Sequence, residues 1–358
     1  MPQQLSIQST SMQSSGRRRP GLGLLIGALL LCAVEAWLHT DGFLYRFRSV
    51  FAAGRAMDKV LYVEANRPEL LILGNSRADN GFDPWTLRRA LDLPLERGAF
   101  NMGIPGADTK VLAGILGRLD DSGCFGTGSV RYLVLSMDES MVQSIDTLGQ
   151  EVFFGSGQRM LVDGQYRDFL RASFRLYGYS QNLRQLREPA ALGRFIQAMN
   201  HEVEPVGGSA AAHLGYRAGF GGLQNSQSAV LQEAGAIDPP DPANVRHLWR
   251  MLDLLSSRGV RVAVVFPPLL NRDVLYLPGM RRESAPYLAV AAELRRRGIP
   301  MLSLDAGPPR NPSEFINAGH MNDRGAQRYS LLLGQALSRI WATPSPATVT
   351  GRLQAKAS

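Results

Sequence analysis

Short β-prone segments alternate with helical segments along most of this chain, and that alternation restricts the possible fold more than any other feature. Five segments are expected to be strands, at residues 70–74, 98–102, 131–136, 260–266 and 300–304. The first of them (LLILG) is wholly apolar, as in a strand that is buried on both faces. Strands that alternate with helices form parallel sheets with helices on both faces. We therefore expect a three-layer αβα domain with its site at the carboxyl ends of the strands.

Helix-start signals agree with this architecture. Two Asp-Pro pairs place a capping aspartate before a proline at the first helical position, at residues 83–84 and 241–242. Further helices are expected over residues 109–120, 284–297 and 324–341. Between about 150 and 240 the periodicity is weak, which favours an insertion that serves as a lid or a partner surface. We assign residues 69–342 to one domain that contains this insertion.

An apolar stretch precedes the domain. Residues 20–38 (PGLGLLIGALLLCAVEAWL) are about long enough for a helix to cross ~30 Å of hydrocarbon. Glu35 and Trp37 lie at its far end, where both can reach the interface. Arginines 17–19 come before it, and the positive-inside rule keeps residues 1–19 in the cytoplasm. We expect a single-pass protein of the cytoplasmic membrane whose domain faces the periplasm or the outside; a cleaved signal peptide is the alternative.

Two less regular segments flank the domain. Residues 39–68 form a juxtamembrane connector, and within them residues 42–64 mix aromatic and basic positions. That mixture predicts an amphipathic connecting helix against the membrane surface. Residues 343–358 are expected to form a flexible tail.

Charge and cysteine content exclude several classes of function. The formal net charge is +8, but the basic residues are spread along the chain without a zinc-finger or RNA-binding signature, so we expect no nucleic-acid partner. Such charge suits a protein near anionic lipid or an acidic glycan. The two cysteines, Cys32 and Cys124, are separated by the expected membrane boundary, and no Cys/His spacing indicates a metal site. We expect no disulfide, metal or cofactor.

A serine follows the first expected strand, in Gly74-Asn75-Ser76-Arg77. A serine at a strand-to-helix turn can expose its hydroxyl while its own backbone N–H helps to hold an oxyanion. Its neighbours Asn75 and Arg77 are candidates for oxyanion or substrate binding. An ordinary turn or helix cap is the alternative interpretation.

Two further segments end near the same expected sheet edge. The sequence NMGIPGAD (101–108) follows the second strand, and either Gly103 or Gly106 could supply a second oxyanion N–H, because glycine lets the backbone approach a ligand closely. His320 lies in FINAGHMN (315–322), just before the last helix. A loop at that edge could bring its imidazole within hydrogen-bond reach of a serine and make it the general base.

In this order, the three segments resemble the SGNH hydrolase superfamily, and within it the membrane-anchored proteins related to alginate O-acetyltransferases and to the D-alanyl transfer protein of teichoic acid synthesis. The resemblance covers roughly residues 69–140 and 258–335. It implies a mainly parallel, flavodoxin-like sheet. It also implies that Ser76 is the nucleophile, His320 the base and Gly106 the oxyanion glycine.

The sequence departs from this family at two positions. Asp138 falls near the family's oxyanion asparagine, and a carboxylate cannot donate a hydrogen bond unless it is protonated. The family's aspartate three residues before the histidine is Asn317 here. An amide can orient an imidazole but cannot stabilise the imidazolium as a carboxylate does. Catalysis is therefore expected to be slow, to recruit another acid, or to be absent.

Three functions are consistent with these observations. The leading hypothesis is an enzyme that transfers or removes O-acyl groups, expected to be acetyl, on an extracytoplasmic polysaccharide. The resemblance further implies a multi-span membrane O-acyltransferase as partner, with membrane lipid contacted through the anchor. The second hypothesis is a non-catalytic SGNH-like binding or assembly subunit of a polysaccharide biosynthesis or export complex. The third is a lipase or lysophospholipase whose apolar groove is lined by residues 150–240.

Overall fold

The structure is a computed structural model that describes most of the chain between residues 21 and 342. The described residues are 21–47, 54–94, 98–126, 129–145, 147, 150–154, 157–200, 212–223, 238–268, 285–303, 311–317 and 319–342. The expected N-terminal tail (1–19) with its arginines, the C-terminal tail (343–358) and parts of the insertion (201–211 and 224–237) lie outside them.

Five parallel strands form the central sheet. They are β1 (Leu70–Gly74), β2 (Ala99–Gly103), β3 (Tyr132–Ser136), β4 (Arg261–Phe266) and β5 (Met301–Ser303). Their order is β2-β1-β3-β4-β5, which is the flavodoxin-like order of a doubly wound sheet. The predicted parallel sheet is confirmed, and β1 lies between β2 and β3 with Leu70 opposite both Ala99 and Tyr132.

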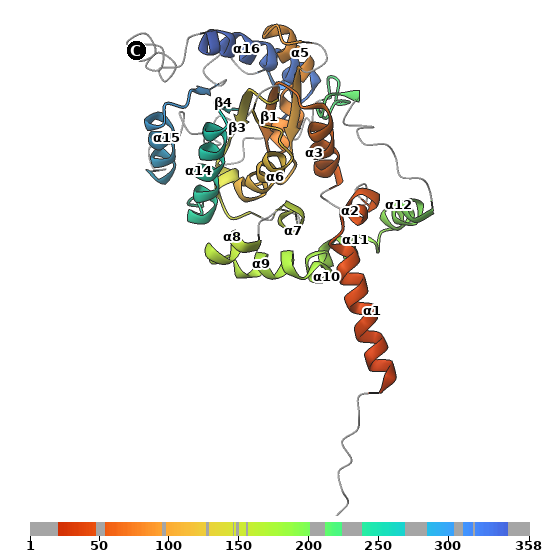
Figure 1. Cartoon of the computed structure of the whole chain (residues 1–358). Helices are drawn as coiled ribbons and strands as arrows, with labels where there is room; N and C mark the ends of the chain where they lie inside the picture. The colour runs from red at the N-terminus through yellow and green to blue at the C-terminus, as the bar shows by residue number, and fades with distance from the viewer. Residues whose placement is uncertain are drawn as a thin grey trace, which may run out of the picture.

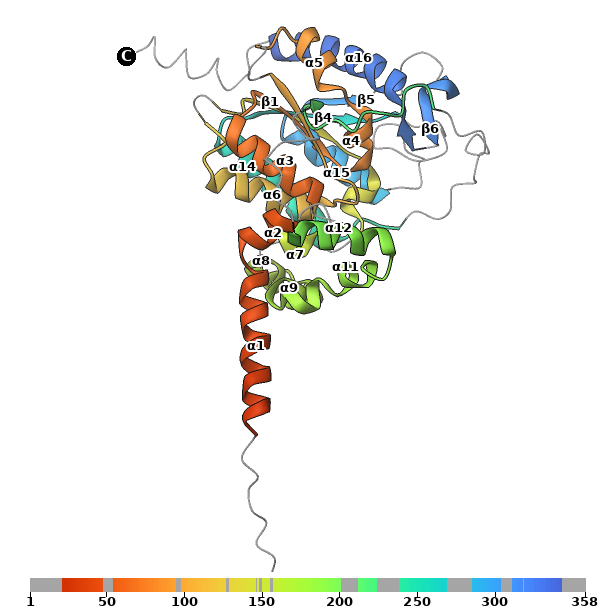
Figure 2. The ribbon, with the colours of Figure 1, turned by 90° about the vertical axis from the view of Figure 1, so that its right-hand side faces the viewer.

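Helices cover both faces of this sheet, as Figures 1 and 2 show. On one face, Leu71 and Leu73 of β1 join a core with α3 (Gly54–Asn66), α6 (Thr109–Asp121), α14 (Pro242–Ser257) and α15 (Ala285–Arg296). On the other face, Leu70 and Ile72 pack with α4 (Ser76–Gly81), α5 (Pro84–Ala90) and α16 (Asp323–Ala342). Successive side chains of a strand point to opposite faces. Because helices cover both faces of the sheet, every side chain of β1 is buried and apolar.

The capping signals read from the sequence are confirmed. Asp83 accepts a hydrogen bond from the Trp85 N–H and begins α5, and Asp241 accepts one from the Ala243 N–H and begins α14. The sequence analysis did not predict α4, a helix of six residues.

The expected single helix over 42–64 is two helices, α2 (Asp41–Phe47) and α3, and the residues between them lie outside the described range. Instead of lying on a surface, α3 buries Met57, Val60 and Val63 in the core. Lys59 is on the same side and is fully buried. Its Nζ lies 2.7 Å from Asp79 Oδ1 and 2.5 Å from the Gly103 carbonyl oxygen. This ion pair joins α3 to α4 and β2 beneath Ser76.

The apolar stretch forms α1 (Leu22–Leu38), which projects away from the domain (Figures 1 and 2). Large apolar side chains are exposed along its length, from Leu22 to Trp37. Among the described residues, α1 alone falls short of the length needed for a span; α1 and α2 together meet the length and composition criteria but are bent by 73°.

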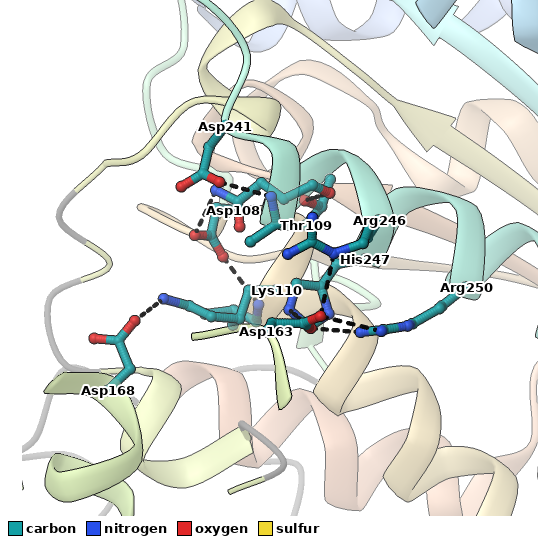
Figure 3. Close-up of polar contacts among 12 residues, drawn as sticks. Asp108, Thr109, Lys110, Asp163, Asp168, Asp241, Arg246, His247 and Arg250 are labelled. Atoms are coloured by element: carbon teal, nitrogen blue, oxygen red, sulfur yellow. Dashed lines mark hydrogen bonds and ion pairs between the residues drawn. The ribbon is translucent and has the colours of Figure 1, made fainter. Parts of the chain in front are cut away.

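The insertion forms short helices on the side of the domain from which α1 projects (Figure 1). They are α7 (Glu151–Phe154), α8 (Gly157–Val162), α9 (Tyr166–Ser173), α10 (Arg175–Gly178), α11 (Ser180–Gln185) and α12 (Pro189–Asn200). Ion pairs hold them to the sheet-covering helices: Lys110 of α6 contacts Asp168 at 2.5 Å, and Arg250 of α14 contacts Asp163 at 2.6 Å (Figure 3). None of these helices exceeds twelve residues, which is why the sequence showed little periodicity.

We predict that Lys59→Met lowers the free energy of unfolding by about 3–5 kcal/mol, because it leaves the Asp79 carboxylate buried without its cation. Urea denaturation of the full chain in detergent, followed by tryptophan fluorescence, measures this loss. The double variant Lys59→Met/Asp79→Leu removes both charges and should regain most of the stability. An unchanged urea midpoint for the single variant would contradict the prediction.

Candidate active site

Ser76 begins α4 directly after β1, at the carboxyl edge of the sheet. The turn is tight at Gly74, where an added Cβ would lie 2.7 Å from the Ser136 carbonyl oxygen and 2.8 Å from Ala78 Cβ. Asn75 caps the helix by accepting the Arg77 N–H at 3.0 Å. The cap fixes the backbone on both sides of Ser76 and leaves the serine half-buried.

A two-stranded hairpin brings His320 to the serine. Strands β6 (Phe315–Asn317) and β7 (His320–Met321) pair in antiparallel fashion just before α16. His320 Nε2 lies 2.9 Å from Ser76 Oγ, and His320 Nδ1 lies 3.0 Å from Asn317 Oδ1. Three of the residues selected from the sequence therefore form one connected chain of polar contacts.

The contacts of Asn317 determine which imidazole nitrogen carries the proton. The backbone N–H groups of Gly319 and His320 both donate to Asn317 Oδ1, each at 2.9 Å, so it is the amide oxygen that faces the ring. An oxygen only accepts, so Nδ1 must be the protonated nitrogen. Nε2 is then free of a proton and can accept the Ser76 hydroxyl hydrogen, which is the tautomer a general base needs.

Asp138 is a hydrogen-bond acceptor in this structure and not a donor to the site. It is fully buried, accepts hydrogen bonds from Asn75 Nδ2 at 2.7 Å and the Ser140 N–H at 2.9 Å, and forms an ion pair with Arg77 at 2.9 Å. Burial alone would raise the pKa of Asp138, but the Arg77 charge and these hydrogen bonds outweigh it and lower the pKa. An ionised carboxylate cannot donate to an oxyanion, so Asp138 instead positions Asn75 and Arg77 around the serine.

Two backbone N–H groups remain as oxyanion donors. The Gly103 N–H is committed to Asn101 Oδ1 at 2.8 Å, which excludes that glycine. Gly106 lies in the turn between β2 and α6 with φ of 74°, a backbone conformation that favours glycine. The Ser76 N–H makes no hydrogen bond within the described part of the chain. Ser76 and Gly106 are therefore the candidates that the geometry retains.

The pKa of His320 is lowered. Burial disfavours the charged imidazolium, and the nearby Arg77 guanidinium adds repulsion, while Asp138 acts in the opposite direction. A lowered pKa keeps the ring neutral, and able to accept a proton, over a wider range of pH.

Sequence reasoning missed several residues around the site. Residues 212–223 of the insertion return to it: the Asn101 N–H donates to the Leu214 carbonyl at 2.8 Å, and the Tyr216 hydroxyl donates to Asp323 Oδ1 at 2.7 Å. The positive charge of Arg217, on this segment, also lowers the pKa of His320. No periodicity marked this segment in the sequence.

Glu139 was also missed, although it directly follows Asp138. Burial and the adjacent Asp138 charge raise its pKa to about 7. Among the described residues, no group of three or more His, Cys, Asp or Glu side chains could hold a metal ion.

Comparison with known proteins gives little further information. No protein-family model and no curated protein matches this sequence significantly. Among solved structures, one from Bacteroides fragilis NCTC 9343, named a "putative acylhydrolase", covers 78% of this chain and 94% of its own. The identity is 10% and the TM-score 0.34. A TM-score this low supports no conclusion about function, so the function is inferred from the geometry around Ser76.

We predict that His320 titrates below 6.5, the ordinary pKa of a histidine, because of its burial and the Arg77 charge. NMR of histidine-labelled protein measures this value, and His320→Gln identifies the signal. Arg77→Gln removes the repelling cation and leaves the Asp138 charge without its ion pair, so the pKa of His320 should rise. A pKa at or above 6.5 in the unaltered protein, or no response to Arg77→Gln, would contradict this electrostatic description.

Proposed function

We propose that this protein is a membrane-anchored serine O-acyltransferase or esterase that uses Ser76 and His320. The observation that carries the proposal is the chain of contacts from Ser76 Oγ to His320 Nε2 and from His320 Nδ1 to Asn317 Oδ1. A serine within hydrogen-bond reach of a base that is itself oriented by a third group is the general arrangement of an activated nucleophile.

The proposed reaction has two halves. Ser76 Oγ attacks the acyl carbonyl carbon while its proton moves to His320 Nε2, and the backbone N–H groups of Ser76 and Gly106 stabilise the oxyanion. The carbonyl re-forms, the bond to the leaving alcohol breaks, and His320 returns the proton to that oxygen. A sugar hydroxyl or water then attacks the acyl-serine and gives its proton to His320 Nε2. The bond from the acyl carbon to Ser76 Oγ breaks, and His320 returns that proton to Oγ.

The anchor is proposed from the surface of α1. A helix with apolar side chains on all sides needs an apolar environment, either a protein core or a bilayer. Leu24, Leu30 and Trp37 are among the exposed side chains of α1, which projects from the domain. Together with arginines 17–19 this favours insertion into the cytoplasmic membrane, with the domain on the periplasmic or outer side.

The acceptor is proposed from the family resemblance stated above. It favours a hydroxyl of an envelope or extracellular polysaccharide, acetyl as the acyl group, and a multi-span membrane O-acyltransferase as the partner that delivers it. An anchor that keeps the domain at the membrane is consistent with such a delivery.

The second candidate is a non-catalytic binding or assembly subunit of a polysaccharide complex. The amide of Asn317 in place of a carboxylate favours it, because an amide leaves the imidazolium without a counter-ion. The ionised state of Asp138 favours it too, since it removes a side-chain donor from the oxyanion site.

We predict that the full chain in detergent hydrolyses an activated acetyl ester and forms an acetyl adduct on Ser76 detectable by peptide mass spectrometry. Ser76→Ala and His320→Ala should each lower turnover at least about a thousandfold, whereas Ser338→Ala, a serine exposed on α16, should leave it unchanged. If the unaltered protein neither turns over nor becomes labelled, the binding-subunit function is the better one.

We further predict that Asn317→Asp raises the turnover by about ten- to a hundredfold, because a carboxylate stabilises the imidazolium. The aspartate oxygen can accept the same two backbone N–H groups, so the hairpin should be undisturbed. Asn317→Ala, which removes the acceptor for Nδ1, should lower turnover. Equal rates for Asn317→Asp and the unaltered protein would show that the amide does not limit the reaction.

A further inference from the structure

The helices of the insertion expose apolar side chains in rows. Tyr166 and Leu170 are four residues apart on one side of α9, Phe174 lies at the break after α9, and Tyr177 belongs to α10. All four are exposed, with Tyr166 at 64% and Phe174 at 57%. On α12, Leu192, Ile196 and Met199 lie at helical spacing and are also exposed. We call these seven residues the base surface.

Two acidic side chains of the same segment contact the domain instead of solvent. Asp163, between α8 and α9, is 3% exposed and contacts Arg246 and Arg250 of α14. Asp168 of α9 contacts Lys110 of α6 (Figure 3). A helix at a water-exposed protein surface normally turns its apolar side inward and its charges outward. Here the acidic side chains Asp163 and Asp168 contact the domain while large apolar side chains are exposed, which favours an apolar environment for the base surface.

Direct contacts join the helices that carry the base surface to α1 and α2. Glu35, in the last turn of α1, accepts the backbone N–H groups of Arg175 at 2.5 Å and Leu176 at 3.0 Å, directly after Phe174. Arg46 of α2 donates to the Ala198 carbonyl of α12 at 2.8 Å, and the Phe47 and Phe195 rings stack with centroids 4.9 Å apart. The α10 part of the base surface therefore adjoins the end of α1 that enters the domain, and its α12 part adjoins α2.

The exposed charges of this segment are mostly positive. Within residues 157–200 five arginines are exposed, at positions 159, 167, 184, 187 and 194. Glu188 is the only exposed acidic residue in that range. Aromatic and aliphatic side chains flanked by arginines are typical of helices that lie in the interface of an anionic membrane.

We propose that the base surface lies in the headgroup and acyl-chain boundary of the leaflet from which α1 emerges, and that it binds anionic lipid. This inference rests on the proposed insertion of α1. The domain would then have two attachments, one helix across the bilayer and a row of helices along its surface. Because both are joined through Glu35 and α2, the Ser76 site is held at a fixed height and orientation above the lipid.

The test measures the depth of single labelled positions in vesicles of mixed phosphatidylcholine and phosphatidylglycerol. Full-chain variants carry Cys32→Ser and one new cysteine at Tyr166, Phe174 or Met199, labelled in detergent with an environment-sensitive fluorophore before reconstitution. Cys124 is buried, and burial raises the pKa of its thiol, so it stays unlabelled. The matched control is Leu331→Cys on α16, an exposed leucine on the opposite side of the sheet. Protein labelled at the native Cys32 reports the insertion of α1 separately.

We expect a blue shift at the three base-surface positions, with loss of most of their fluorescence to a lipid quencher placed near the headgroups and little to an aqueous quencher. Leu331→Cys should show the opposite response. If Cys32 reports the bilayer interior while the base-surface positions respond like Leu331→Cys, the proposal is overturned although the anchor stands, and a protein partner would have to cover this surface. If Cys32 also remains in water, the anchor itself fails and the proposal fails with it.

Discussion

The pairing of β1 with two parallel neighbours is the interaction on which the rest of the structure depends. Because β2 and β3 both run parallel to β1, their carboxyl ends and that of β1 meet at one edge. The connection from β1 to β2, through α4 and α5, covers one face of the sheet, whereas the connection from β2 to β3, through α6, covers the other. Ser76, Gly106 and Asp138 each follow one of these three strands, so their proximity is a consequence of the sheet and not of local sequence.

Two ion pairs, Lys59–Asp79 and Arg77–Asp138, lie around the turn that carries Ser76. The buried Lys59–Asp79 pair joins α4, the helix that Ser76 begins, to α3, and Lys59 also contacts Gly103 of β2; removal of either charge would leave the other buried and unpaired, which is costly. Beside Ser76, Asp138 neutralises Arg77 and orients Asn75. Burial and, after it, the Arg77 charge lower the pKa of His320 and favour its neutral form, and the hairpin presents the oxygen of Asn317 to the ring. An amide therefore suffices to select the tautomer, although it provides no counter-ion for the imidazolium.

The insertion is attached to α1 and α2 by direct contacts. Glu35 would be an unfavourable residue near the end of an apolar helix, yet its carboxylate is satisfied by two backbone N–H groups at the start of α10. The ion pairs of Asp163 and Asp168 hold the other side of the insertion to α6 and α14. This segment places acidic side chains against its own domain and exposes apolar side chains and arginines, which is why we propose that this side of the molecule contacts an anionic membrane.

The sequence by itself determined the strands, the capped helices and the candidate pair Ser76 and His320. Short apolar runs, Asp-Pro caps and residues at strand ends are local patterns. Such patterns can be recognised in the sequence without knowledge of the fold. Lys59 was within reach of the same reasoning, since it shares the apolar side of α3 with Ala56, Val60 and Val63, at helical spacing.

Only the tertiary structure decided what these residues contact. Ser76 and His320 are 244 positions apart in the sequence, so their 2.9 Å contact cannot be predicted from spacing, because it depends on how the hairpin and α16 pack against α4. The role of Asp138 depends on its contacts with Arg77 and Ser140, and the burial of the insertion's acidic side chains depends on their contacts with α6 and α14. The sequence carries the composition of each segment, whereas burial and long-range pairing, which set pKa and orientation, arise only when the layers are assembled.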